Sequence, residues 1–194
     1  MLTDLLQKIR DFFLPSAVVS SGPLLGAGNV HGLVRHPGMQ VHEWEAYLAA
    51  CAEANVSPDR IIQVVGNAPA SQGYHLPDGQ FTNSNGHLED YTAALDLSVK
   101  HPNGHLSTAQ IKKLLDCLAK RGFIGWYRPW GDNEHIHVVY CGLPMKAKLR
   151  DQVHDWFKHL DGLVDHAYDG FVLPTATEMN FCRALFLAHN PANG

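Results

Sequence analysis

Residues 134–140 read Glu-His-Ile-His-Val-Val-Tyr, a run that combines two histidines with strand-favouring residues. The β-branched and aromatic residues at 138–140 favour extended structure, so we expect a β-strand here. Side chains two positions apart on a strand point to the same face, which places His135 beside His137. Such a pair can supply a metal ligand and a neighbouring base. In a chain with 13 histidines, however, it can also be an ordinary pair of surface or core residues.

A second stretch, residues 85–96, reads Asn-Gly-His-Leu-Glu-Asp-Tyr-Thr-Ala-Ala-Leu-Asp. Asp96 begins a further strand-like run, Asp-Leu-Ser-Val. A carboxylate and imidazoles from separate strands suit zinc, which takes three protein ligands in catalytic sites and leaves a fourth position for water. The two stretches together therefore indicate a zinc site between neighbouring strands.

The order of these residues resembles the LAS-type zinc peptidases, which include lysostaphin-like enzymes, D-alanyl-D-alanine metallopeptidases and the sonic hedgehog signalling domain. Members carry Ser-x-His-x-x-Gly-x-Ala-x-Asp, followed later by Glu-x-Trp-His or His-x-His. Residues 94–96 fit Ala-x-Asp, and residues 134–137 fit both Glu-x-x-His and His-x-His. Residues 71–74, Ser-Gln-Gly-Tyr, are similar to the Ser-Gly-Tyr-Arg turn that precedes the metal motif in many members. The resemblance covers residues 60–140.

This resemblance implies that one zinc ion is bound by His87, Asp96 and His137. His87 stands nine positions before Asp96, whereas the family pattern has seven, so a two-residue insertion is needed. His75 is an alternative first ligand.

The resemblance also implies a general base and a substrate-binding surface. Glu134 occupies the position of the family's catalytic Glu, three residues before His137, and is our first candidate for the base. His135 is the second candidate, because it shares a strand face with His137. Arg128 is a candidate for binding a substrate carboxylate through its planar fork, or else an ordinary surface residue. The other residues predicted to bind substrate are Gln72, Tyr74 and His75.

We therefore predict a zinc metallopeptidase that cleaves peptide (amide) bonds in peptidoglycan peptides, of the D-Ala-D-Ala peptidase or peptidoglycan endopeptidase type. One alternative is a domain of the same fold that binds metal for recognition without catalysis. Another is a small α+β protein whose histidines are incidental.

Composition limits the partners. The formal net charge is −4 and no basic patch stands out, which argues against nucleic acid. No stretch is long and apolar enough to span a bilayer. Residues 1–15 lack the apolar region and cleavage site of a signal peptide, so we expect a cytoplasmic protein or one exported by another route.

The cysteines at 51, 117, 141 and 182 contain no Cys-x-x-Cys, and buried thiols are favoured over two disulfides.

Periodicity along the chain predicts one α+β domain over 1–194, in which a small, mostly antiparallel sheet is flanked by helices. Residues 60–140 form the metal-site core and residues 144–194 a helical C-terminal part. Gly66 to Asn85 is predicted to be a long loop that forms one wall of the site. Helices are expected over 1–15, 42–55, 107–122, 144–159 and 178–188. Strands are expected over 61–65, 95–99, 123–127 and 134–140.

Overall fold

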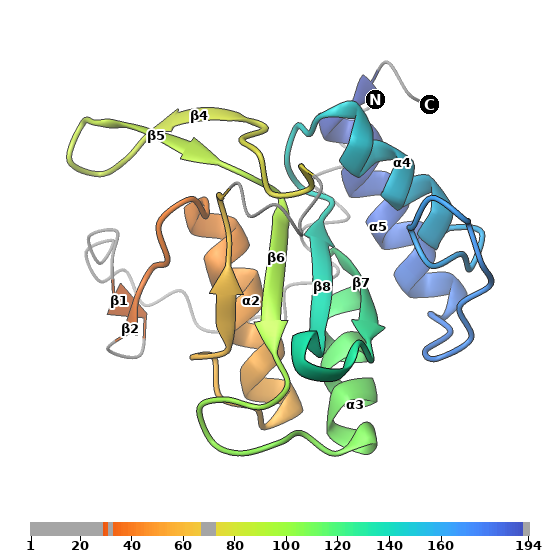
Figure 1. Ribbon diagram of the computed structural model, residues 1–194. Coiled ribbons are helices and arrows are strands. Elements are labelled where there is room, and N and C mark those ends of the chain that lie inside the picture. The colour runs from red at the N-terminus through yellow and green to blue at the C-terminus, as the bar shows by residue number, and fades with distance from the viewer. Residues whose placement is uncertain (1–28, 31–32, 67–72, 192–194) are drawn as a thin grey trace.

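The computed structural model describes residues 29–30, 33–66 and 73–191. The predicted helix over 1–15 lies outside these residues, and so does Gln72. Within them, helices and antiparallel strands form an α+β fold with a small antiparallel sheet, as the sequence predicts (Figure 1).

A four-stranded antiparallel sheet lies at the centre of the fold (Figure 1). Its strands are β3 (Ile61–Gln63), β6 (Ala94–Ser98), β7 (Phe123–Arg128) and β8 (His135–Tyr140). Their order across the sheet is β3-β6-β8-β7, so β8 is an interior strand. All six residues of β8 are buried, because elements cover both faces of the strand.

The two faces of β8 meet different helices. On one face, Val138 closes over Gly125 together with Leu115, a residue of α3 (Thr108–Ala119). A Cβ on Gly125 would lie 2.6 Å from Val138 Cγ1, so the glycine permits this close packing. The opposite face carries the two histidines of the strand, and Gln152 from α4 (Ala147–Trp156) reaches it. One face of β8 therefore belongs to the core and the other to a polar site.

The remaining helices frame the sheet (Figure 1). α2 (Val41–Ala54) packs beside α3 behind the sheet, and α5 (Ala176–His189) lies with α4 at the β7 side. A capping box begins α3, since the Ser107 side chain accepts a hydrogen bond from Gln110 N and the Gln110 side chain accepts one from Ser107 N.

A two-stranded hairpin stands where the sequence predicts part of a long loop. It consists of β4 (Gly79–Thr82) and β5 (Leu88–Tyr91), and it projects from the body of the fold beside β6 (Figure 1). The loop prediction over 66–85 is wrong for this part. The short strands carry mainly polar residues and Gly79, so the sequence has no clear apolar alternation to indicate them. A second short pair, β1 (Asn29–Val30) and β2 (Leu33–Val34), completes the strands of the described residues.

The base of the hairpin is closed by Asp78, whose side chain is fully buried. Its Oδ2 accepts hydrogen bonds from Thr92 Oγ1 (3.1 Å) and Ala93 N (2.8 Å), while Oδ1 accepts one from Lys146 N (2.9 Å). Asp78 N donates to Tyr91 O at 2.8 Å. The two ends of the hairpin are thus held together, and the chain leaves and re-enters the sheet region at one place.

Cys51, Cys117, Cys141 and Cys182 are buried free thiols, which confirms the sequence prediction. Among the described residues, no helix is long and apolar enough to cross a membrane.

Candidate metal centre

The register of the sheet brings the key residues together. Asp96 of β6 pairs directly with His137 of β8, and Ser98 pairs with His135. Residues directly opposite each other on antiparallel strands have side chains on the same face. The predicted proximity of Asp96 and His137 is therefore a consequence of strand pairing.

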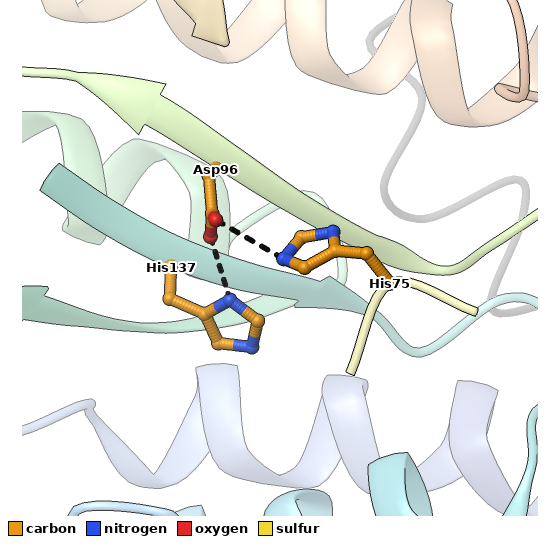
Figure 2. A group of neighbouring side chains, drawn as sticks. All are labelled: His75, Asp96 and His137. Carbon is orange, nitrogen blue, oxygen red and sulfur yellow. Dashed lines mark hydrogen bonds and ion pairs between the residues drawn. The ribbon is translucent and has the colours of Figure 1, made fainter. Parts of the chain in front are cut away.

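Asp96 lies between two imidazoles (Figure 2). Its Oδ1 is 2.8 Å from His137 Nδ1, and its Oδ2 is 3.1 Å from His75 Nε2. One ligand atom from each of the three residues lies within 4.8 Å of the others, so the group could hold a metal ion. His75 and His137 are buried, and Asp96 is nearly so.

The predicted first ligand is corrected by this arrangement. His87 lies in the turn between β4 and β5 and is exposed, so it does not belong to the group. His75, the alternative ligand, takes that place. The hairpin explains the difference, because it carries His87 away from the sheet while its closed base keeps His75 close to Asp96.

Each imidazole of the group is also held from its other nitrogen. His75 Nδ1 lies 2.9 Å from the backbone oxygen of Val64, and His137 Nε2 lies 3.1 Å from Gln152 Oε1. All four ring nitrogens therefore face oxygen atoms. A neutral imidazole carries only one N–H, so it can satisfy one of its two oxygen neighbours. A cation between Asp96 and the two rings would resolve this mismatch for both histidines.

The pKa shifts of Asp96 and His137 fit a carboxylate beside a neutral His137 ring. Burial raises the pKa of Asp96, but hydrogen bonds from His137 and His75 outweigh it and leave the pKa well below its usual range. Burial lowers the pKa of His137, because the charged imidazolium is poorly solvated inside the protein. A carboxylate and a neutral imidazole are the forms that bind metals. The residues present thus fit a metal ion.

The group lies in the wall of a cavity of about 600 Å³. Apolar side chains on one side of this cavity come from Trp130, Leu163 and Val164, and Val164 is largely exposed. The other lining residues are Gln63, Tyr74, His75, Asp96, Arg128, Asn133, His135, His137, Gln152 and Asp165. A cavity of this size accepts a small molecule or a few residues of a peptide.

His135 lines the cavity beside the metal group. Its Nδ1 lies 2.6 Å from Asn133 O, so Nδ1 carries the hydrogen of the neutral ring and Nε2 is left as a proton acceptor. That Nε2 lies 3.8 Å from Asp96 Oδ1. The imidazole therefore lies in the cavity wall next to the carboxylate of the metal group.

Arg128 also lines the cavity and is only 5% exposed. Its guanidinium lies over the rings of Trp126 and Trp130, 5.3 and 5.4 Å from their centroids. Its Nη2 donates to Asp161 O at 2.6 Å. Within the described residues no carboxylate lies in ion-pair distance of it, and burial lowers its pKa. A buried cation without a counter-ion favours binding of an anionic group.

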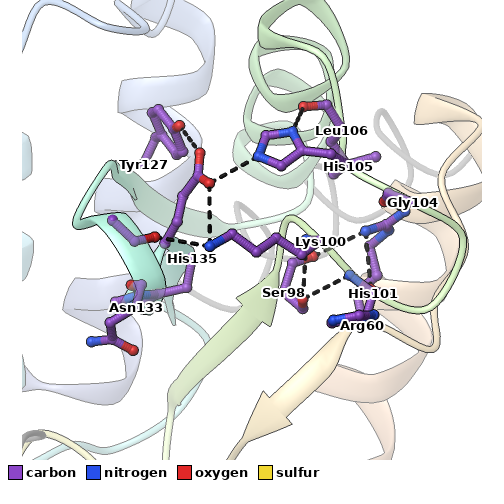
Figure 3. Close-up of polar contacts among 12 residues, drawn as sticks. Arg60, Ser98, Lys100, His101, Gly104, His105, Leu106, Tyr127, Asn133 and His135 are labelled. Carbon is purple, nitrogen blue, oxygen red and sulfur yellow. Dashed lines mark hydrogen bonds and ion pairs between the residues drawn. The ribbon is translucent and has the colours of Figure 1, made fainter.

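Glu134 is placed elsewhere. It does not line the cavity, and its Oε1 accepts a hydrogen bond from the Tyr127 hydroxyl. Its Oε2 lies 2.8 Å from His105 Nε2 and 3.9 Å from Lys100 Nζ; Figure 3 shows the residues around it. Of the two residues predicted as candidates for the base, His135 lines the cavity and Glu134 does not.

Of the other predicted residues, Tyr74 lines the cavity and its ring contacts that of His137 with centroids 6.0 Å apart. Gln72 is outside the described residues. The sequence analysis missed Gln152. A signal was present, since Gln152 is a polar residue beside Leu149 and Val153 on the inward face of a helix, and buried polar groups need partners.

No family model, curated protein or solved structure matches the chain.

Proposed function

We propose that the chain is a zinc-dependent hydrolase that cleaves peptide (amide) bonds, with the metal bound by His75, Asp96 and His137. The observation that carries the proposal is the position of the two imidazoles. One nitrogen of each ring faces Asp96, and the other nitrogen faces an oxygen atom of Val64 or Gln152. Two nitrogens and one carboxylate form the ligand set of several catalytic zinc sites, which keep a fourth position for water.

Zinc bound there would lower the pKa of a water molecule and polarise the carbonyl of a substrate. The protein's own contribution begins with His135. Its Nε2 is free to accept a proton in the cavity, and the bond from Nδ1 to Asn133 O holds the ring in place. After the proton is taken up, the same ring can pass it to the leaving amine.

Arg128 would orient the substrate. Its guanidinium is held between two indole rings, so it is preorganised to bind a carboxylate or another anionic group of the substrate. The apolar wall of Trp130, Leu163 and Val164 would receive an apolar part of the same molecule. These features suit a short peptide that carries both groups.

The fold geometry also supports the resemblance to the LAS-type zinc peptidases, and with it peptidoglycan peptides as the substrate. His75 and Asp96 are 21 positions apart, but 14 of the intervening residues, 79–92, are the β4–β5 hairpin and the residue that follows it. Without these 14 residues, His75 would stand seven positions before Asp96, which is the spacing in the family pattern.

The experiment that tests the proposal is hydrolysis of a panel of peptidoglycan fragments by the full chain, followed by mass spectrometry. We expect cleavage that is abolished by a chelator and restored by zinc. His135→Ala should keep its zinc and reduce hydrolysis by about 10²–10⁴-fold, the usual contribution of a positioned base.

The outcomes separate the alternatives. Zinc binding without cleavage of any fragment would overturn the peptidase proposal and favour a recognition domain that binds metal. Equal hydrolysis by the wild type and His135→Ala would remove His135 from the catalytic role.

A further inference from the structure

Gln152 connects two parts of the cavity that are far apart in the sequence. It is 3% exposed and lies on α4. Its Oε1 faces His137 Nε2 at 3.1 Å, and its Nε2 donates to Gly162 O at 3.1 Å. The second bond fixes the orientation of the amide, because only the NH₂ group can donate to a carbonyl oxygen. The oxygen of Gln152 must therefore be the atom that meets His137.

We propose that Gln152 is a positioning residue that holds His137 in the tautomer able to bind metal through Nδ1, and that it ties this ligand to the cavity wall. When a cation takes the place of the Nδ1 hydrogen that faces Asp96, the acceptor at Nε2 stabilises the ring form with hydrogen on Nε2 and the lone pair on Nδ1. Nδ1 is the nitrogen that faces Asp96. The inference rests on the proposed metal site, because the tautomer matters only if a cation binds there.

The wall to which Gln152 is tied is the segment 160–165 between α4 and α5. Three successive carbonyls of this segment accept hydrogen bonds from side chains of the site region: Leu160 O from the buried Trp126 Nε1 (2.8 Å), Asp161 O from Arg128 Nη2 (2.6 Å) and Gly162 O from Gln152 Nε2 (3.1 Å). Of the three donors, Arg128 and Gln152 line the cavity.

Close packing also holds this segment in place. Gly162 has φ +68°, and a Cβ there would lie 2.8 Å from the Trp126 ring. Residues 163–165 then line the cavity directly. One amide thus links the geometry of a metal ligand to the surface that a substrate would touch.

Two substitutions separate the two bonds of Gln152. Gln152→Met keeps the approximate length and removes both bonds. Gln152→Glu keeps an oxygen acceptor for His137 and loses the donor to Gly162 O. Gln80→Met is the matched control, because Gln80 is exposed on β4, donates to Asp90 Oδ1 and does not line the cavity.

Zinc affinity, measured on the full chain by competition with a chromophoric chelator, should fall by about 10–100-fold in Gln152→Met, as for other losses of a ligand's hydrogen-bond partner. Gln152→Glu should bind zinc at least as well as the wild type, and the zinc affinity of Gln80→Met should equal that of the wild type. Hydrogen exchange at 160–165 should become faster in both Gln152 variants, because both lose the bond to Gly162 O.

If Gln152→Met binds zinc as tightly as the wild type, the inference is wrong. It is also wrong if Gln152→Glu loses as much zinc affinity as Gln152→Met. If Gln152→Met does not fold, long-range ¹⁵N–¹H spectra of the zinc-loaded wild type decide the matter. We expect His137 to be metal-bound through Nδ1 and protonated at Nε2, and the reverse would refute the assignment. A wild type that binds no zinc would instead refute the proposed function, and the inference with it.

Discussion

Asp96 and Glu134 both contact histidine, but the first contact is largely buried and the second lies at the surface. Asp96 is largely buried between His75 and His137, in the wall of a cavity. Glu134 accepts bonds from Tyr127 and His105 and lies near Lys100, and the His105 side chain is 52% exposed. Burial lowers the pKa of His137, whereas the hydrogen bond that His105 donates to Glu134 raises the pKa of His105.

The difference between Asp96 and Glu134 shows that contact between a carboxylate and an imidazole does not by itself indicate a metal site. At the surface, His105 can be protonated, and a charged ring can donate from both nitrogens to Glu134 and to Leu106 O. The cluster is then satisfied as an ion pair. In the buried group the neutral form of His137 is favoured, so a ring with two oxygen neighbours is left with one hydrogen. Only the buried group gains from a cation.

The largest effect that we expect is on zinc affinity, and it distinguishes Asp96 from Glu134. Asp96→Asn removes the charge of the central ligand with almost no change in size. Zinc affinity should fall by more than about 100-fold, because even the loss of a partner outside the ligand set costs about 10–100-fold. Glu134→Gln should leave zinc affinity unchanged, and isothermal titration of both full-length variants with zinc measures this. Equal losses in the two variants would mean that both carboxylates act on one metal, contrary to the structure.

We expect a smaller effect, on stability, from a third carboxylate, Glu43 of α2. Like Asp96 it is buried, but no histidine of the described residues forms a hydrogen bond or ion pair with it. It is fully buried, and its Oε1 has no hydrogen-bond partner. Burial raises its pKa well above the usual range, against the lowering at Asp96. The folded state therefore holds a proton that the unfolded state releases, and stability falls as pH rises from the unfolded pKa through the folded one.

Glu43→Gln mimics the protonated carboxyl and keeps an oxygen for Gln40 N, which donates to Glu43 at 3.1 Å. At pH 8 we expect the variant to be more stable than the wild type by about 1–3 kcal/mol, the usual cost of an uncompensated buried polar group in proteins. Below the unfolded pKa the two should be equally stable. Urea unfolding at several pH values measures this, and a gap that narrows as pH rises would show that the sign is wrong.

Much of the sheet could be predicted from the sequence, because β-branched runs such as Ile61–Gln63 and residues 138–140 leave few alternatives to strands. The pair of Asp96 and His137 could also be predicted, since both stand within strand-like runs. The cavity could not be predicted from strand and helix patterns alone. Its apolar wall comes from residues 163 and 164 in an irregular segment that no periodicity marks.

The first ligand could not be chosen by spacing along the chain. His87 is nearer to Asp96 in sequence, but the β4–β5 hairpin closes at Asp78 and turns 21 positions of sequence into a short distance in space. The base was uncertain for a related reason. Glu134 and His135 are adjacent, and only the conformation at the start of β8 determines which one lines the cavity.

The central claim is that His75, Asp96 and His137 bind zinc, and metal analysis of matched histidine variants tests it most directly. The wild type, His75→Ala and His87→Ala are purified as full chains without chelator and analysed for zinc. We expect about one zinc per chain in the wild type and in His87→Ala, and almost none in His75→Ala. Zinc retained by His75→Ala and lost from His87→Ala, or a folded wild type that binds no zinc, would contradict the claim.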